Sequence, residues 1–256
     1  MDSLTLKLIL TPTLIAAASM AGRRWGPAVS GWLVGLPLTS GPIAFFLALN
    51  QGVAFARAAA IGTLTGTISQ AAFCLAYGWL AWRFAWPLTV LVSSLVFAGS
   101  TVALQYLSLP LVTLFLTVIL FLILAHCLMP RRPEASSSAG KLPLWDIPVR
   151  MVIATAFVLL LTGLAPTLGP YLTGLLTPFP LYAAILAVFE HHLRGPAPAA
   201  GVVRGLLLGL FAFASFFLVL AALVEQVGIA LAFAAAIMVT AVFQGGSLWV
   251  FQRMSG

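Results

Sequence analysis

Long apolar runs, each of a length that a membrane helix needs, follow one another along this 256-residue chain. A helix crosses the hydrocarbon layer with about 20 apolar residues, and only helices and closed barrels satisfy every backbone polar group there. The runs are too long and too uniformly apolar for barrel strands. Because 62% of the residues are hydrophobic and 7% are charged, we predict an all-α polytopic membrane protein. Nine crossings are expected, near residues 4–22, 29–49, 56–82, 84–104, 108–129, 148–167, 170–190, 200–224 and 227–250.

The basic residues are distributed unequally between the two sides that these crossings define. Of the 12 Lys and Arg residues, only Lys7 and Arg57 fall on one side. Cytoplasmic loops carry an excess of such residues, so the N-terminus is expected in the periplasm and the C-terminus in the cytoplasm. Topology thus explains the net charge of +7, and no nucleic acid partner is predicted. The side expected to be cytoplasmic receives Arg23, Arg24, Arg83, Arg131, Arg132, Lys141, Arg150, Arg194, Arg204 and Arg253.

Impermeant thiol labelling of intact cells tests this topology, with a single cysteine placed at Ser3 or at Ser137. We expect Ser3→Cys to be labelled and Ser137→Cys to be protected, because position 3 is expected outside the cell membrane and position 137 in a cytoplasmic loop. Labelling at residue 137 without labelling at residue 3 would reverse the orientation.

A polar, Pro/Ser-rich connector at residues 130–147 divides the chain into 1–129, with five crossings, and 148–256, with four. When the second part is moved back by 143 positions, "GPAVSGWLVGLPLTSGP" aligns without a gap with "GPYLTGLLTPFPLYAAI". Chance similarity between apolar segments would match leucines and alanines, whereas here glycines and prolines match. We therefore predict an internal repeat. The matched pairs are Gly26 and Gly169, Pro27 and Pro170, Gly31 and Gly174, Pro37 and Pro180, Gly52 and Gly195, Gly62 and Gly205, and Gly66 and Gly209.

The direction of the two copies follows from the number of crossings between them. The 143 residues that separate corresponding positions of the two copies contain five crossings. Because this number is odd, the second copy is expected to enter the membrane from the opposite side to the first. Inverted repeats recur in secondary transporters, where the substrate site lies between the copies. They also occur in some channels.

Both copies interrupt the same helix, with "GLPLTSGP" at 35–42 and "TPFPLY" at 177–182. Proline removes a backbone hydrogen bond and clashes with the preceding turn, and paired interruptions in two halves point to a transporter's binding site. A packed structural kink is the alternative. Freed carbonyls are expected around Gly35, Pro37 and Gly41. The residues predicted to bind substrate here are Gly35, Pro37, Thr39, Ser40, Gly41, Pro42, Thr177, Pro180 and Tyr182.

Ser69 and Gln70 lie at the centre of the third expected crossing and complete the predicted site. An unpartnered Gln in hydrocarbon is costly, so Gln70 is expected to face a polar interior. There it either contacts substrate or ties two helices together. The counterparts in the second copy are Ala212 and Phe213, so the site is expected to be asymmetric.

A cluster of ionisable residues, Glu190, His191 and His192, ends the crossing at 170–190. It is either a gate or proton sensor, since His titrates near neutrality, or a solvated helix end. Adjacent histidines lack the i, i+4 spacing of a zinc pair. With no Ser-His-Asp set, phosphate loop or metal constellation, the sequence predicts no enzyme, no metal site and no cofactor.

Residues 169–225 contain "GLLTPFPLYAAILAVFEHHLRG" followed by "VVRGLLLGLFAFASFF". In its order of Gly, Pro-Phe-Pro, His and Arg-Gly, this segment resembles the small inner-membrane proteins of the GlpM type, here as a fused, doubled form. The resemblance covers about a quarter of the chain. It implies a bacterial inner membrane location and no particular substrate.

Together these features predict a transporter that moves a small molecule by alternating access between inverted repeats. One alternative is a flippase for a lipid or a lipid-linked intermediate. Another is a non-transporting scaffold for a membrane complex. The expected partners are membrane lipids and a small-molecule or lipid substrate.

Overall fold

The computed structural model describes residues 37–130 and 145–254, together with separate helical positions at 5, 8–13, 16 and 20. Five of its helices are long and apolar enough to cross a membrane, namely α4, α5, α6, α7 and α10. The predicted all-α fold with membrane-type helices is confirmed for this part of the chain. The helices are α3 (Ser40–Gln51), α4 (Val53–Leu80), α5 (Trp86–Leu104), α6 (Leu111–Leu128), α7 (Asp146–Leu168), α8 (Pro170–Leu176), α9 (Leu181–Arg194) and α10 (Pro196–Met254).

Single glycines make the sharp turns between successive helices. Gly52 separates α3 from α4 and has φ 88°, and Gly195 separates α9 from α10 and has φ 93°. Gly228, with φ 79°, interrupts α10 and divides it into two helices. Side chains disfavour positive φ, and glycine has none. Two expected crossings, 200–224 and 227–250, therefore occupy the two arms of α10.

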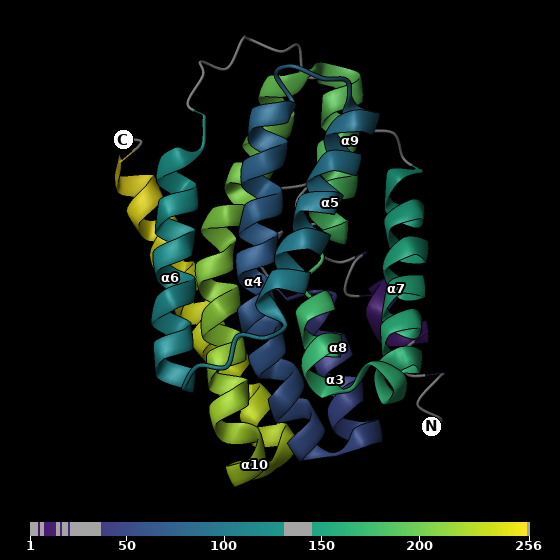
Figure 1. Ribbon diagram of the computed structural model, residues 1–256, viewed down its shortest axis with the longest axis vertical. Coiled ribbons are helices and arrows are strands. Elements are labelled where there is room, and N and C mark those ends of the chain that lie inside the picture. Colours follow the sequence, from purple (N-terminus) through teal and green to yellow (C-terminus); the bar gives the residue numbers. More distant parts are fainter. Residues whose placement is uncertain are drawn as a thin grey trace.

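The turns recur at the spacing of the predicted repeat. Gly52 and Gly195 are 143 positions apart, as are Val53 and Pro196, which begin α4 and α10. The α3–α4 turn lies at the lower end of the molecule in Figure 1, and the α9–α10 turn lies at the upper end. The α3–α4 and α9–α10 turns therefore lie 143 positions apart in the sequence and at opposite ends of the molecule in that view.

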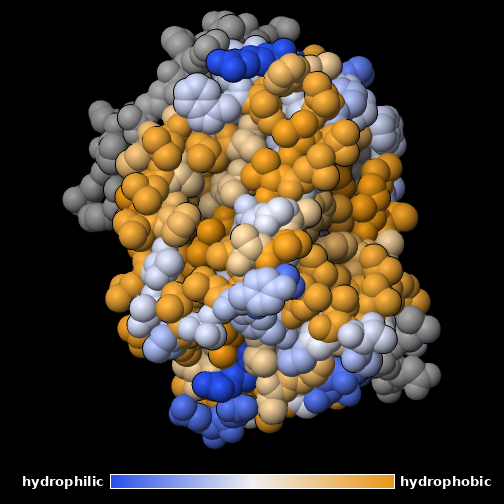
Figure 2. All heavy atoms as spheres, viewed as in Figure 1, coloured by the Kyte–Doolittle hydropathy of each residue, from blue (hydrophilic) through white to orange (hydrophobic). Residues whose placement is uncertain are grey.

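The least apolar of the spanning helices is the most buried. In its most apolar window α4 is 78% buried with a mean hydropathy of 1.3, whereas α6 is 22% buried with a value of 2.7. The most extensive contacts of α4 are with α10 and α8. The face in Figure 2 is largely hydrophobic, and hydrophilic residues gather towards its upper and lower ends. An exposed apolar surface of this extent marks contact with a membrane or a partner.

Glycines allow α8 to cross α4 at very short range. A Cβ atom built on Gly66 of α4 would lie 2.6 Å from the carbonyl oxygen of Leu175, and one built on Gly174 of α8 would lie 2.9 Å from the Cα of Gly62. Small residues at such crossings let helix backbones approach each other in membranes. The contact holds the end of α8, and so the helix break that follows it, against α4.

Candidate functional site

The segment between α8 and α9 lies against the start of α3. α8 ends at Leu176 and α9 begins only at Leu181. Residues 37–39 are not helical and α3 begins at Ser40. The hydroxyl of Ser40 donates a buried hydrogen bond to the carbonyl oxygen of Thr177 at 3.1 Å. The helix predicted at 170–190 is therefore broken between Leu176 and Leu181, and this break contacts the residue at which α3 begins. The interruption predicted at 35–42 stays a prediction, because the residues before 37 lie outside the described ones.

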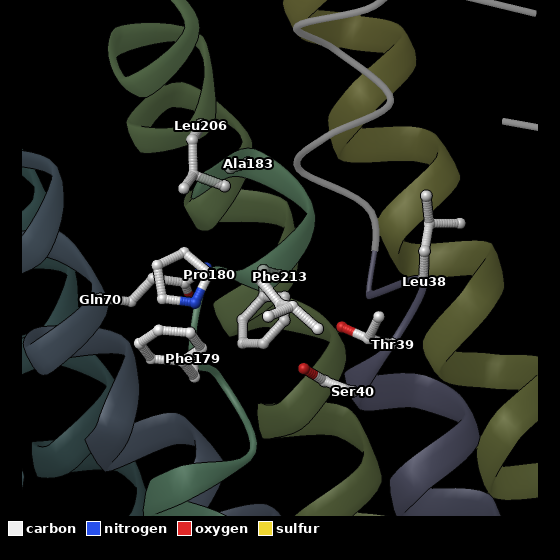
Figure 3. Close-up of a pocket in the computed structure, with 10 residues that line it drawn as sticks. Leu38, Thr39, Ser40, Gln70, Phe179, Pro180, Ala183, Leu206 and Phe213 are labelled. Carbon is white, nitrogen blue, oxygen red and sulfur yellow. The ribbon is translucent and has the colours of Figure 1, made fainter. Parts of the chain in front are cut away.

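A small cavity of about 30 Å³ lies where this break and the start of α3 meet α4 and α10. That volume is enough for about one or two water molecules. In Figure 3, Gln70 and Pro180 border the space on one side and Thr39 and Ser40 on the other. The cavity is lined by Leu38, Thr39, Ser40, Gln70, Phe179, Pro180, Leu181, Ala183, Leu206 and Phe213.

Several of the lining residues are counterparts in the predicted repeat. Three pairs are each 143 positions apart, namely Leu38 with Leu181, Ser40 with Ala183, and Gln70 with Phe213. Residues that the predicted repeat aligns therefore meet at the same space. In two of these pairs the residue from the first half of the chain is polar, Ser40 or Gln70, and its counterpart is apolar.

Gln70 brings a carboxamide to the cavity from the middle of α4. The residue is 5% exposed, and its Oε1 has no hydrogen-bond partner among the described residues. Burying such a group without a partner costs roughly 1 to 3 kcal/mol. A polar cavity of this size lets water or a ligand supply the missing hydrogen bond.

The expectation that the first break leaves the Pro37 carbonyl free is wrong. That carbonyl accepts a hydrogen bond from the N–H of Gly41 at 2.7 Å, and the carbonyl of its counterpart Pro180 accepts one from the N–H of Ala184 at 2.7 Å. Gly41 and Pro42 lie in the first turn of α3 rather than in the break. Proline is tolerated there, because first-turn N–H groups have no intrahelical acceptor.

Other residues of the predicted site are placed differently. Ser69 is fully buried and accepts a hydrogen bond at 3.1 Å from the Thr101 hydroxyl of α5, so it joins two helices outside the cavity lining. Thr177 joins the α8–α9 break to the start of α3 through its carbonyl group. The backbone of Tyr182 lies in the first turn of α9. Gly35 falls outside the described residues.

The predicted gate lies at the opposite end of α9 from the cavity, about 14 Å along the helix. Glu190 is 6% exposed and pairs with Arg194 at 3.1 Å, so the alternative of a solvated helix end is wrong for this carboxylate. Nδ1 of His191 lies 3.4 Å from the Tyr77 hydroxyl. The ring of His192 lies 6.0 Å from the indole that begins α5. The three residues therefore have different neighbours and do not border the cavity.

Sequence reasoning missed the aromatic part of the lining. Phe179 lies inside "TPFPLY", and its ring centroid is 5.2 Å from that of Phe97 on α5. Phe213 was identified only as the counterpart of Gln70. The repeat alignment was the available signal, because a residue in register with a site residue is expected to approach the same space.

The described residues contain no group of three or more His, Cys, Asp or Glu side chains that could hold a metal ion. The chain matches no protein-family model, and neither a curated protein nor a solved structure matches it. Function is therefore inferred from the geometry of the cavity and the helices around it.

Proposed function

We propose that this protein is a membrane transporter of a small molecule and that its substrate binds at the cavity between the two helix breaks. The observation that carries the proposal is the contact of Ser40, where α3 begins, with Thr177 in the α8–α9 break, beside the buried carboxamide of Gln70. Non-helical backbone within a membrane is tolerated where protein buries it or where it lines a cavity. Transporters built from repeats place their substrate sites at broken helices of this kind.

The proposed mechanism is alternating access between inverted repeats at 1–129 and 148–256. It is supported by the turns of the α3–α4 and α9–α10 pairs at Gly52 and Gly195, which are 143 positions apart and lie at opposite ends of the molecule in Figure 1. Two such copies can exchange conformations and so expose one site to each side in turn. A cavity of about 30 Å³ is too small for most solutes, so substrate entry requires the copies to move.

The proposed location is the bacterial inner membrane, with a periplasmic N-terminus and a cytoplasmic C-terminus. The distribution of basic residues supports the orientation, and the GlpM-type resemblance supports the membrane. Lipids would contact the exposed apolar faces of α5, α6 and α7, which carry large hydrophobic side chains such as Leu95, Leu120 and Leu160.

Cysteine accessibility tests alternating access without knowledge of the substrate. Ser40→Cys, in a Cys74→Ala, Cys127→Ser background, places a thiol at a cavity residue that is 2% exposed. We expect a small impermeant reagent to label it from the outside in cells and from the inside in inverted vesicles, because each access state opens the cavity to one side.

The matched control is Thr101→Cys in the same background. Thr101 is also buried, at 3% exposure, but it bonds to Ser69 and does not line the cavity, so we expect no labelling from either side. Protection of the Ser40 position from both sides would contradict alternating access and favour the scaffold. Labelling only by a lipid-soluble reagent would favour the flippase.

A further inference from the structure

Two helices begin at the cavity. Ser40 is the first residue of α3 and Leu181 is the first residue of α9, and both line it. Neither helix has a side-chain cap at its N-terminus. The N-terminus of a helix carries a partial positive charge of about +0.5 that favours anions. The N–H groups of Gly41, Ile43, Leu181 and Ala184 already donate to backbone carbonyls, so this partial charge, rather than a set of free N–H groups, is what the two ends offer. The cavity thus receives two positive helix ends.

Charged side chains near the cavity neither cancel nor increase the positive potential of the two helix ends. None of the described residues that line the cavity is ionisable. One ion pair, between Glu190 and Arg194, lies at the far end of α9, and another joins Arg57 to Glu225 at 3.4 Å between α4 and α10. The two helix ends together balance about one negative charge. A second negative charge would have no cation at the cavity to pair with it.

Gln70 is an independent sign of a ligand. It lines the same cavity, it is 5% exposed, and its Oε1 has no partner among the described residues. The O and N atoms of a carboxamide exchange places when the group rotates by about 180°. The amide can therefore turn its N–H groups towards an anion held between the two helix ends.

We propose that the substrate of this site carries a single negative charge, and that a carboxylate or an inorganic monoanion binds between the N-termini of α3 and α9 with the Gln70 amide donating to it. The role of this anion as a substrate rests on the proposed transport function, whereas its binding to the site does not. The rings of Phe179 and Phe213 border the space and would contact the apolar remainder of an organic substrate.

Thermal unfolding of the purified full-length protein in detergent tests the charge requirement. The probes are sodium formate, sodium chloride and formamide, the last being a neutral molecule of nearly the same shape as formate. Sodium sulfate holds the ionic strength constant. A ligand that binds the native state preferentially raises its melting temperature, so we expect saturable stabilisation by formate or chloride and none by formamide. Stabilisation by formamide as strong as that by formate, or by none of the probes, would overturn the proposal.

The relative affinities of formate and chloride identify the chemical class of the anion that the site binds. Tighter binding of formate assigns the site to a carboxylate, and tighter binding of chloride assigns it to an inorganic anion. Either result supports a monoanion site.

Variants at Gln70 locate the binding. Gln70→Leu removes a hydrogen bond to a charged ligand, so we expect at least about tenfold weaker binding of the stabilising anion. Gln70→Glu adds a negative charge and should abolish the binding, whereas a site for cations would gain affinity. If these variants fail to fold, Thr39→Val provides the same measurement at a second polar residue of the lining.

Thr67→Val is the matched control, because Thr67 is fully buried on the same helix and its hydroxyl bonds to the Thr63 carbonyl at 3.0 Å. We expect its affinity to stay within about twofold of the parent value. An equal loss in Thr67→Val and Gln70→Leu would show a general effect of α4 packing and overturn the assignment of the site.

Flux in proteoliposomes separates this inference from the proposed function. Saturable anion binding without flux of that anion or of any carboxylate tested would retain the site and overturn the transport function. Flux of a neutral or cationic solute, without anion binding, would retain the transport function and overturn the anion site.

Discussion

Gly174→Val is expected to destabilise the protein severely, by more than about 3 kcal/mol, because it forces α8 away from α4. A Cβ atom at this position would lie 2.8 Å from the carbonyl carbon of Ala59 and 2.9 Å from the Cα of Gly62. Both are backbone atoms and cannot rotate away as a side chain can. Overpacking a well-packed core costs about 1 to 3 kcal/mol where side chains can adjust. The loss is measured by thermal unfolding and by the yield of monodisperse protein in detergent.

Gly163→Ala is the matched control for this prediction. Gly163 lies within α7, and a Cβ atom there would meet nothing within 4 Å. Alanine is the better helix former by about 1 kcal/mol, so we expect unchanged or slightly higher stability. A Gly174→Val protein with the parent melting temperature would contradict the close approach of α8 to α4.

Replacing Pro37 and Pro180 together with alanine is expected to close the cavity and abolish access to it. Each proline lacks an N–H and therefore disfavours a helix that would continue past it. Alanine is the residue that best continues a helix. Continuous helices would remove the two turns that line the space. We expect the Ser40→Cys position to lose labelling from both sides, and formate or chloride binding to weaken by more than tenfold. Insertion should be retained, because it follows hydropathy.

Pro42→Ala separates the effect of the break from the loss of any proline. Pro42 lies in the first turn of α3, after the break has ended, and the missing N–H of a first-turn proline leaves no intrahelical bond unmade. We expect labelling and anion binding close to those of the parent protein. If the double variant keeps its accessible cavity, the prolines do not maintain the breaks and the proposed site loses its structural basis.

The sequence indicated which helix would be central only indirectly. The third expected crossing, which became α4, contains small and hydroxylated residues and has a mean hydropathy of 1.3, against 2.7 for α6. Hydropathy alone does not decide burial, because α10 has the same mean hydropathy of 2.7 as α6 and is 67% buried. The Gly62–Gly174 crossing likewise depends on where α8 lies.

The sequence by itself determined the apolar helices and the break between α8 and α9, because these are consequences of local backbone chemistry. A proline lacks its N–H wherever it occurs, and only glycine adopts positive φ without a steric penalty. The spacing of 143 positions between Gly52 and Gly195 was therefore readable before any contact was known. The hydrogen bonds within these segments could not be predicted in the same way. The carbonyl of Pro37, which was expected to be free, accepts a hydrogen bond.

Tertiary structure decided which side chains meet. Ser69 and Gln70 are neighbours in the sequence, yet successive helical residues point about 100° apart. The rotation of α4 against α5 and α10 turned Gln70 to the cavity and Ser69 to Thr101. These outcomes require contacts between distant segments, and hydropathy does not encode the rotation of one apolar helix against another.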